Sequence, residues 1–272
     1  GTAQSYRESD QRTGDGMGQL DNHVCVVTGG SHGIGEAIAR GFAAEGATVA
    51  ITYRPGEPEP DGIVDALSRT GRPALVVPME AGDPESIRAA FTAIKDRLGV
   101  PDVLVANAGY AEIRPVTELT IEQFDRMLAV HLRGTFLCVQ AVLPGMKARG
   151  YGRIVNISSR AALGKPLRTV YSITKAGLHG LTRTLALEIG HHGITVNAIG
   201  PGPIATELFE RVNPPDAPAT KRIIESIPVR RMGTPDDVAH GVAMLLDPRS
   251  GFITGQVLYV CGGMTVGLGH AA

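Results

Sequence analysis

The chain has 272 residues, and its 26 Lys and Arg against 27 Asp and Glu give a net charge of −1. This balance argues against a protein that holds nucleic acid through bulk charge. No run approaches the roughly 18 uncharged apolar residues of a membrane helix, so we expect no membrane partner. The three cysteines are too few and too scattered for a disulfide framework or a zinc cluster, and we expect no metal. These bounds predict a cytoplasmic globular protein.

The first twenty residues differ from the rest of the chain. Residues 1–20 are polar, follow no apolar period and contain no apolar core of a secretory signal. We interpret them as a flexible polar tail, and residues 21–272 as a single domain.

From His23 onward, short apolar runs of strand length alternate with helical stretches. The runs are apolar at nearly every position, which is typical of strands covered on both faces. Seven such runs are present, at residues 23–28, 47–53, 74–79, 102–108, 153–158, 194–199 and 256–260. Alternation of strand and helix indicates parallel strands joined by right-handed crossovers. The predicted fold is therefore α/β, a doubly wound parallel sheet of the Rossmann type with helices on both faces.

A glycine-rich turn joins the first predicted strand to the first predicted helix. It reads Thr28-Gly29-Gly30-Ser31-His32-Gly33-Ile34-Gly35. Glycines in such a turn allow a tight bend, a close approach of backbone to phosphate, and contact between helix and strand. The N–H groups at the start of the helix favour an anionic pyrophosphate. Three glycines alone are weak evidence, but their place in a doubly wound pattern favours dinucleotide binding.

Four further motifs follow the glycine turn in chain order. They are Ala106-Asn107-Ala108-Gly109, Asn156-Ile157-Ser158-Ser159, Tyr171-Ser172-Ile173-Thr174-Lys175 and Pro201-Gly202-Pro203-Ile204-Ala205-Thr206. Together with the glycine turn they resemble the short-chain dehydrogenase/reductase family, from about residue 20 to about residue 265. Within that family, the branch of 3-oxoacyl-acyl-carrier-protein reductases is the most similar.

The Tyr–Lys motif has a chemistry of its own. Tyr171 and Lys175 are four residues apart on a predicted helix, so both project from one face. The lysine cation should favour the phenolate and lower the pKa of Tyr171 from about 10. The resemblance implies that Tyr171 moves the proton, that Lys175 assists it, and that a serine holds the substrate oxygen. Motif position makes this serine Ser159, whereas Ser158 has the 13-residue spacing to Tyr171 that the family often shows; we prefer Ser159.

His131 departs from the family pattern. The family usually has an asparagine where this chain has histidine, and its backbone carbonyl holds a water that links the lysine to solvent. Since a backbone role survives a change of side chain, we interpret His131 as a structural replacement within the catalytic set. The alternative is a proton-relay group that titrates near pH 7.

The resemblance also implies which residues contact the cofactor. They are Gly29, Ser31, His32, Gly33, Ile34, Gly35, Tyr53, Arg54, Glu80, Asn107, Ala108, Gly109, Tyr171, Lys175, Pro201, Gly202, Ile204 and Thr206. Members that prefer NAD usually carry an aspartate at the end of the second strand, where this chain has Tyr53 and then Arg54. Without that carboxylate a 2′-phosphate is not repelled, and Arg54 can pair with it. We therefore expect NADP(H), with NAD(H) as the alternative.

These residues lead to a functional hypothesis. We expect an oxidoreductase that interconverts a small-molecule ketone and a secondary alcohol. The family resemblance further implies a homotetramer, with the helices at 118–149 and 171–192 forming one interface. Residues 204–228 should form a lid over the substrate, and Arg160 and Arg168 are either surface charges or partners of an anionic substrate group. One alternative is an NAD-dependent sugar, polyol or cyclic-alcohol dehydrogenase. Another is a lyase, an epimerase or a non-catalytic nucleotide sensor on the same fold.

Overall fold

The structure, a computed structural model, describes residues 18–57, 59–60, 62–69, 71–214 and 216–266. Its centre is a seven-stranded sheet in which every neighbouring pair is parallel. The strands are β1 (Val24–Val27), β2 (Thr48–Tyr53), β3 (Ala74–Pro78), β4 (Val103–Ala106), β5 (Gly152–Ile157), β6 (Ile194–Pro201) and β7 (Val257–Val260). Each of the seven predicted apolar runs overlaps one of these strands, although β5 begins one residue before its run and β6 ends two residues after its run. The predicted fold class is confirmed.

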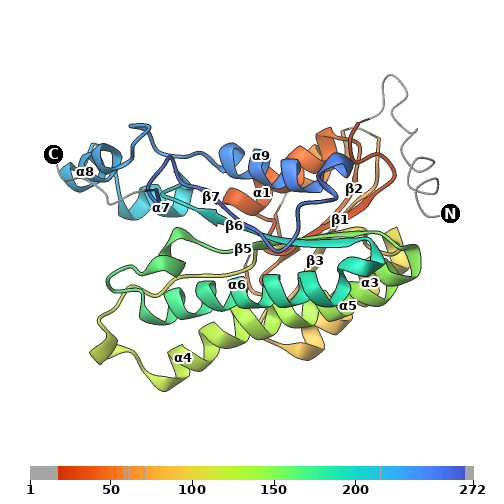
Figure 1. Ribbon diagram of the computed structural model, residues 1–272, viewed down its shortest axis with the longest axis horizontal. Helices are drawn as coiled ribbons and strands as arrows, with labels where there is room; N and C mark the ends of the chain where they lie inside the picture. Colours follow the sequence, from red (N-terminus) through yellow and green to blue (C-terminus); the bar gives the residue numbers. More distant parts are fainter. Residues whose placement is uncertain (1–17, 58, 61, 70, 215, 267–272) are drawn as a thin grey trace.

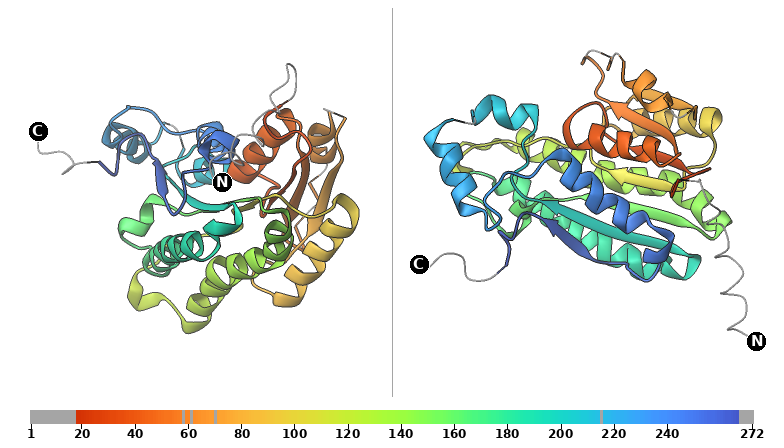
Figure 2. Two further views of the ribbon diagram at one scale, coloured as in Figure 1. Left: turned by 45° about the vertical axis from the view of Figure 1, so that its right-hand side comes forward. Right: turned by 90° about the horizontal axis from the view of Figure 1, so that it is seen from above.

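Helices cover both faces of the sheet (Figure 1). One face carries α1 (Gly33–Ala44), α2 (Ile63–Ser68) and α9 (Pro235–Leu246). The other face carries α3 (Pro84–Leu98), α5 (Gly134–Arg149) and α6 (Thr169–Ile189), with α4 (Ile121–Leu128) packed against α6. Two short helices, α7 (Glu207–Val212) and α8 (Pro218–Ser226), lie at the end of the molecule near which β6 ends (Figure 2).

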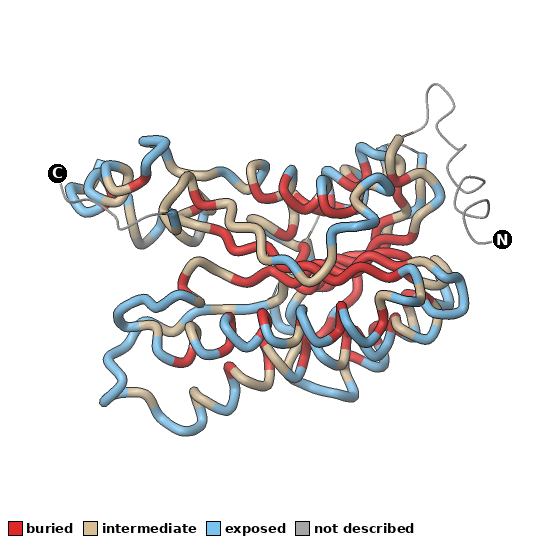
Figure 3. Tube along the Cα trace, in the orientation of Figure 1, coloured by how far each residue is buried: buried red, intermediate tan, exposed pale blue. Residues whose placement is uncertain are grey.

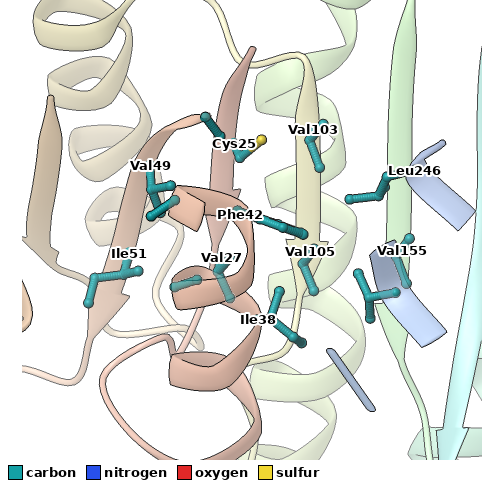
Figure 4. Packing of buried hydrophobic residues seen from close by; sticks show 14 of the residues in the cluster. Cys25, Val27, Ile38, Phe42, Val49, Ile51, Val103, Val105, Val155 and Leu246 are labelled. Atoms are coloured by element: carbon teal, nitrogen blue, oxygen red, sulfur yellow. The ribbon is translucent and has the colours of Figure 1, made fainter. Parts of the chain in front are cut away.

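The core has two halves, one on each side of the sheet, because alternate residues of a strand point to opposite faces. Cys25 and Val27 of β1 pack toward α1, where they meet Ile38 and Phe42 (Figure 4). Val26, between them, packs on the other face in the half formed with α3, α5 and α6. Buried residues accordingly concentrate in the strands and on the inner sides of the helices (Figure 3). This burial on both faces is why the strands are apolar at almost every position.

The strand order places the site. The sheet runs β3-β2-β1-β4-β5-β6-β7, so the chain reverses its direction of progress between β1 and β4. In open α/β sheets, ligands bind beyond the carboxyl ends of the strands at such a switch point. The glycine turn follows β1, and the Asn107 and Ser159 motifs follow β4 and β5, so all three meet at this edge.

The predicted helix over residues 118–149 is interrupted. It begins at Ile121 behind a capping box of Thr120 and Gln123, and a π-helical turn, Ala129–Arg133, separates α4 from α5. π-Helical turns of this kind occur frequently at functional sites, and this one contains His131. Within Ile121–Arg149, an 18-residue window has a mean hydropathy of 1.4, so this stretch is long and apolar enough to cross a membrane by length and composition only. Its buried side packs against α3, β4 and β5.

The start of the described chain corrects one predicted boundary. Residues 18–20 were expected to belong to the tail, but Leu20 is only 2% exposed and packs with the core beside α1. The main-chain N–H of Leu20 donates to the carbonyl of Glu45 at 3.0 Å. The packed domain therefore begins before residue 21, and residues 1–17 of the predicted tail lie outside the described residues.

Candidate active site

The turn after β1 is fixed to the segment after β4. The hydroxyl oxygen of Thr28 accepts from the main-chain N–H groups of Asn107 (3.0 Å) and Ala108 (3.1 Å). In return, the Asn107 amide donates to the carbonyls of Thr28 (3.1 Å) and Gly29 (2.8 Å). The side-chain nitrogen of Asn107 therefore supports the glycine turn through its two bonds to the carbonyls of Thr28 and Gly29.

The three glycines of the predicted phosphate pattern, Gly29, Gly33 and Gly35, each have a distinct steric reason. Gly29 has a φ of 62°, and a Cβ there would lie 2.9 Å from Cα of Ala108. A Cβ on Gly35 would lie 2.1 Å from the carbonyl oxygen of Gly29, so the helix can approach the turn only with glycine at this position. Gly33 begins α1 with a φ of 57°, and a Cβ there would face Thr206 at 3.4 Å. Backbone freedom is thus required at the first and second glycines, and close packing at the third.

The residues present fit the phosphates of a dinucleotide. His32 is the N-cap residue of α1 and makes no side-chain cap to the helix, so the N–H groups of the first turn are open to an anion. A side chain at position 33 would extend into the space between this turn and Thr206, where the phosphates would lie. This is the arrangement that the spacing of the glycines predicts.

The ends of β2 and β3 bring two predicted cofactor residues together. Arg54, just after Tyr53, lies with its Nε 3.5 Å from a carboxylate oxygen of Glu80, which follows β3. Both side chains are largely exposed, at 54% and 38%. At the glycine turn, Ser31 Oγ and His32 Nδ1 are 3.0 Å apart. Arg54 therefore has a carboxylate partner of its own beside the predicted 2′-phosphate position.

The loop after β6 contains the remaining predicted cofactor residues. Pro201 is the last residue of β6, and the N–H of Gly202 donates to the carbonyl of Val260 at 2.9 Å. Ile204 is only 6% exposed and packs into the core beside α1, so its side chain is structural. Thr206 caps α7 by accepting from the N–H of Phe209 at 3.2 Å.

The two adjacent serines after β5 have different surroundings. Ser158 is buried, and its hydroxyl donates to the carbonyl of Lys175 at 2.9 Å and lies 2.8 Å from Nε2 of His179. Ser159 is half-buried; its hydroxyl accepts from the main-chain N–H of Ala161 at 3.1 Å, and its closeness to Tyr171 acts to lower the pKa of that phenol. Ser158 therefore attaches β5 to α6, whereas Ser159 is the serine that meets the tyrosine.

Tyr171 and Lys175 differ from the expected pair in one respect. Nζ of Lys175 lies 5.6 Å from the centroid of the Tyr171 ring and donates to the carbonyl of Ile157 at 2.8 Å. Burial lowers the pKa of Lys175 to about 8. Burial also raises the pKa of Tyr171, and the nearby hydroxyl of Ser159 and the charge of Arg168 act against this rise. The predicted net lowering of the pKa of Tyr171 is therefore wrong, because desolvation of the phenolate outweighs the opposing effects.

His131 lies beneath this group with both ring nitrogens occupied. Nε2 accepts from the main-chain N–H of Tyr110 at 3.0 Å, and Nδ1 lies 2.8 Å from Oγ1 of Thr174. Thr174 in turn donates to the carbonyl of Tyr171 at 2.9 Å. Burial, followed by the charge of Lys175, lowers the pKa of His131 to about 2. This value is at odds with a proton relay near pH 7 and favours the structural interpretation.

Sequence reasoning missed three partners of this group. Thr174 and Tyr110 bind His131, and His179 binds Ser158. Thr174 lies within the Tyr–Lys motif, so its place on the helix beside Lys175 was a usable signal. Tyr110 directly follows the Asn107 motif. Among the described residues, no cluster of three or more His, Cys, Asp or Glu side chains is arranged to hold a metal ion.

Comparisons with known proteins agree with this geometry. A family model described as enoyl-(acyl carrier protein) reductase matches residues 29–265. The (2S)-[(R)-hydroxy(phenyl)methyl]succinyl-CoA dehydrogenase subunit BbsD of Thauera aromatica is 39% identical, and the alignment covers 91% of this chain and 98% of the relative. The 3-oxoacyl-[acyl-carrier-protein] reductase of Synechocystis sp. is 35% identical, with 92% and 100% covered.

A solved structure supports the same assignment. The crystal structure of a blue fluorescent protein from a metagenomic library, in complex with NADPH, is similar with a TM-score of 0.83 and 36% identity. The match covers 91% of this chain and all (100%) of that chain. From its sequence, its seven-stranded sheet and these relatives, the chain belongs to the short-chain dehydrogenase/reductase family and is an oxidoreductase.

Proposed function

We propose that this oxidoreductase interconverts a ketone and a secondary alcohol with NADP(H), as in the 3-oxoacyl-acyl-carrier-protein reductase branch. The observation that carries the proposal is that three side chains come together: Ser159 lies near enough to Tyr171 to act on the pKa of its phenol, and Nζ of Lys175 lies 5.6 Å from the centroid of the same ring. This group supplies a proton donor, a hydroxyl to hold the substrate oxygen, and a cation near the developing charge.

The residues divide the work as follows. NADP(H), held by the glycine turn and the first turn of α1, supplies the hydride. Ser159 donates a hydrogen bond to the substrate oxygen and places it against Tyr171. Tyr171 gives its phenolic proton to that oxygen in reduction and takes it back in oxidation. Lys175 stabilises the resulting phenolate by its charge. His131, neutral and buried, positions the backbone of Tyr171 through Thr174.

The preference for NADP(H) is part of the proposal. Its support is the absence of a carboxylate at Tyr53–Arg54 and the exposed guanidinium of Arg54 beside the end of β2. The NADPH bound in a similar protein agrees with it. The ion pair with Glu80 opposes it, since a 2′-phosphate must compete with that carboxylate for Arg54.

The location and assembly of the protein are also proposed. We expect a cytoplasmic homotetramer, with α4–α5 and α6 forming one interface. Exposed apolar side chains on α5 and α6 support this interface, namely Phe136, Ile173 and Leu187. Residues 204–228, which include α7 and α8, are proposed as the lid over the substrate.

Side-by-side titrations with NADPH and NADH test the function, each followed by a panel of ketones with consumption of reduced nicotinamide measured by absorbance. Tighter binding of NADPH with turnover is the expected result. A preference for NADH would indicate the alternative alcohol dehydrogenase. Binding without turnover of any ketone would contradict the reductase and favour the lyase, epimerase or sensor.

A further inference from the structure

The segment between Ser159 and Tyr171 is positively charged. It carries Arg160, Lys165 and Arg168 and contains no acidic residue. No ion pair found in the described part of the chain includes any of these three cations. The pKa of Lys165 is lowered by burial first and then by the charges of Arg168 and Arg160. The segment therefore carries three positive charges within residues 160–168, which directly connect the proposed catalytic residues Ser159 and Tyr171 along the chain.

Arg168 has the position of a binding residue. It precedes α6 as its N-cap residue, and its charge favours the phenolate of Tyr171. Its Nη1 is buried and has no hydrogen-bond partner among the described residues. A buried guanidinium nitrogen without a partner is costly, and a bound acceptor removes that cost. Arg168 therefore has an unused donor at the start of α6, three residues before Tyr171 in the chain.

The backbone next to Arg168 is held in an unusual conformation. Leu167 has a φ of 63°, a region that non-glycine residues rarely adopt. Its carbonyl accepts from the main-chain N–H of Arg114 at 3.1 Å, which connects this segment to the loop after β4. Such strain is concentrated at functional sites, where the surrounding structure maintains it.

The neighbouring loop does not neutralise the cluster. Glu112 is the only acidic residue between Asn107 and Val116, and its carboxylate lies 3.7 Å from Nε of Arg114. The acid of that loop is thus already paired with a cation of the same loop. The charges of Arg160, Lys165 and Arg168 therefore remain available to attract an anion.

We propose that Arg168, with Arg160 and Lys165, binds an anionic group of the substrate while its ketone lies at Ser159 and Tyr171. This inference rests on the proposed reductase function and adds the substrate class to it. A guanidinium can bind a carboxylate or a phosphate through two parallel hydrogen bonds, and the flanking cations attract either group. Two sources share this chemistry: a carboxylate in a short keto acid, and the phosphates of a nucleotide thioester.

Matched pairs of ketones test the proposal and separate the two sources. Acetoacetate and its neutral ethyl ester differ in the carboxylate. Acetoacetyl-CoA and the acetoacetyl thioester of N-acetylcysteamine differ in the nucleotide phosphates. The readout is the ratio of kcat/KM for the anionic to the neutral member of each pair, because a general effect on Tyr171 cancels in that ratio.

We expect Arg168→Ala to lower one of these ratios by about 10- to 100-fold, the size of a lost charged hydrogen bond. The pair that responds identifies the carboxylate or the phosphates as the source. Arg168→Lys, which keeps a cation, should recover part of the loss, and Arg160→Ala and Lys165→Ala should give smaller losses. Arg97→Ala is the matched control, since this exposed arginine ends α3 at the opposite edge of the sheet. Unchanged ratios in Arg168→Ala would overturn the proposal.

A binding measurement tests the anion site even if the protein reduces no ketone, so failure of the anion site and failure of the proposed function can be distinguished. 3-Hydroxybutyrate and coenzyme A are titrated by calorimetry into the protein saturated with NADP⁺, for the parent and for Arg168→Ala. If no ketone is reduced, the reductase proposal fails, and this titration still decides on the anion site. Affinity that falls about tenfold or more in Arg168→Ala supports the site. Equal affinities in the two proteins, together with unchanged ratios where turnover occurs, reject it.

Discussion

Nε2 of His131 accepts a hydrogen bond from the main-chain N–H of Tyr110 at 3.0 Å, which joins the π-helical turn before α5 to the loop after β4. Because an amide nitrogen can only donate here, Nε2 carries no proton and the neutral ring is protonated at Nδ1. The Nδ1–H group then donates a hydrogen bond to the hydroxyl oxygen of Thr174, and this hydroxyl donates a hydrogen bond to the carbonyl of Tyr171. The histidine thereby connects two segments of the site while it stays neutral.

We expect His131→Ala to destabilise the fold and slow turnover without changing the pH dependence of kcat. The substitution leaves the Tyr110 N–H and the Thr174 hydroxyl without their partner and opens a cavity, at a cost of about 2 to 4 kcal/mol. Urea unfolding and the pH profile of kcat measure the two effects. Loss of a titration step between pH 6 and 7 in the variant would instead indicate a proton relay. His131→Gln, which can accept and donate at similar positions, should recover part of the stability.

His131 also predicts a pH dependence of stability. Its pKa is lowered from 6.5 to about 2, so the unfolded chain binds a proton below pH 6.5 that the folded chain does not. Its contribution to the free energy of unfolding is therefore complete above pH 6.5 and is lost as the pH falls. Between pH 7.5 and pH 4.5 the parent should lose roughly 2 to 3 kcal/mol more than His131→Gln does. Chemical denaturation of both proteins at several pH values measures this difference, and parallel curves would contradict it.

The adjacent serines should respond differently to removal of the hydroxyl. Ser159→Ala removes the hydroxyl beside Tyr171, so kcat/KM should fall by about 100-fold or more, and loss of its bond to the Ala161 N–H should cost about 1 kcal/mol of stability. Ser158→Ala removes the bond to the Lys175 carbonyl and should cost about 1 to 2 kcal/mol of stability. Ketone turnover and thermal unfolding of both variants make the comparison. A greater loss of turnover in Ser158→Ala, with its fold intact, would assign the catalytic role to Ser158.

The sequence was sufficient for the sheet and for the residues around Tyr171, but not for their hydrogen-bond partners. Strands buried on both faces are apolar along their whole length, so the seven runs could be identified without contacts. The bond from Tyr110 to His131 joins residues 21 apart in the chain, and its geometry depends on the π-helical turn, which no local pattern predicts. The raised pKa of Tyr171 likewise depends on burial, which the spacing to Lys175 does not reveal.

Arg54 and Glu80 make the choice of cofactor testable in both directions. Arg54→Ala should weaken NADPH binding by about tenfold and NADH binding much less, since only NADPH carries the 2′-phosphate. Glu80→Gln removes the carboxylate that lies 3.5 Å from Arg54, and it should strengthen NADPH binding. Fluorescence titration of both cofactors with both variants measures the effects. Equal losses for NADPH and NADH in Arg54→Ala would exclude Arg54 as the phosphate partner.

Tyr171 and Lys175 should give the two reaction directions different pH profiles. Burial raises the pKa of Tyr171, so the phenol is protonated and ready to donate at neutral pH. Lys175, with a pKa of about 8, loses its charge above that pH and no longer stabilises the phenolate. Ketone reduction should therefore be flat from pH 6 to about 8 and decline above it as Lys175 loses its charge, whereas alcohol oxidation, which needs the phenolate, should rise throughout pH 6 to 8 because the pKa of Tyr171 lies above this range. Tyr171→Phe should abolish both reaction directions and leave the affinity for the cofactor unchanged. If ketone reduction by the parent protein showed a titration step at acidic pH, the assignment of Tyr171 as the proton donor would be contradicted.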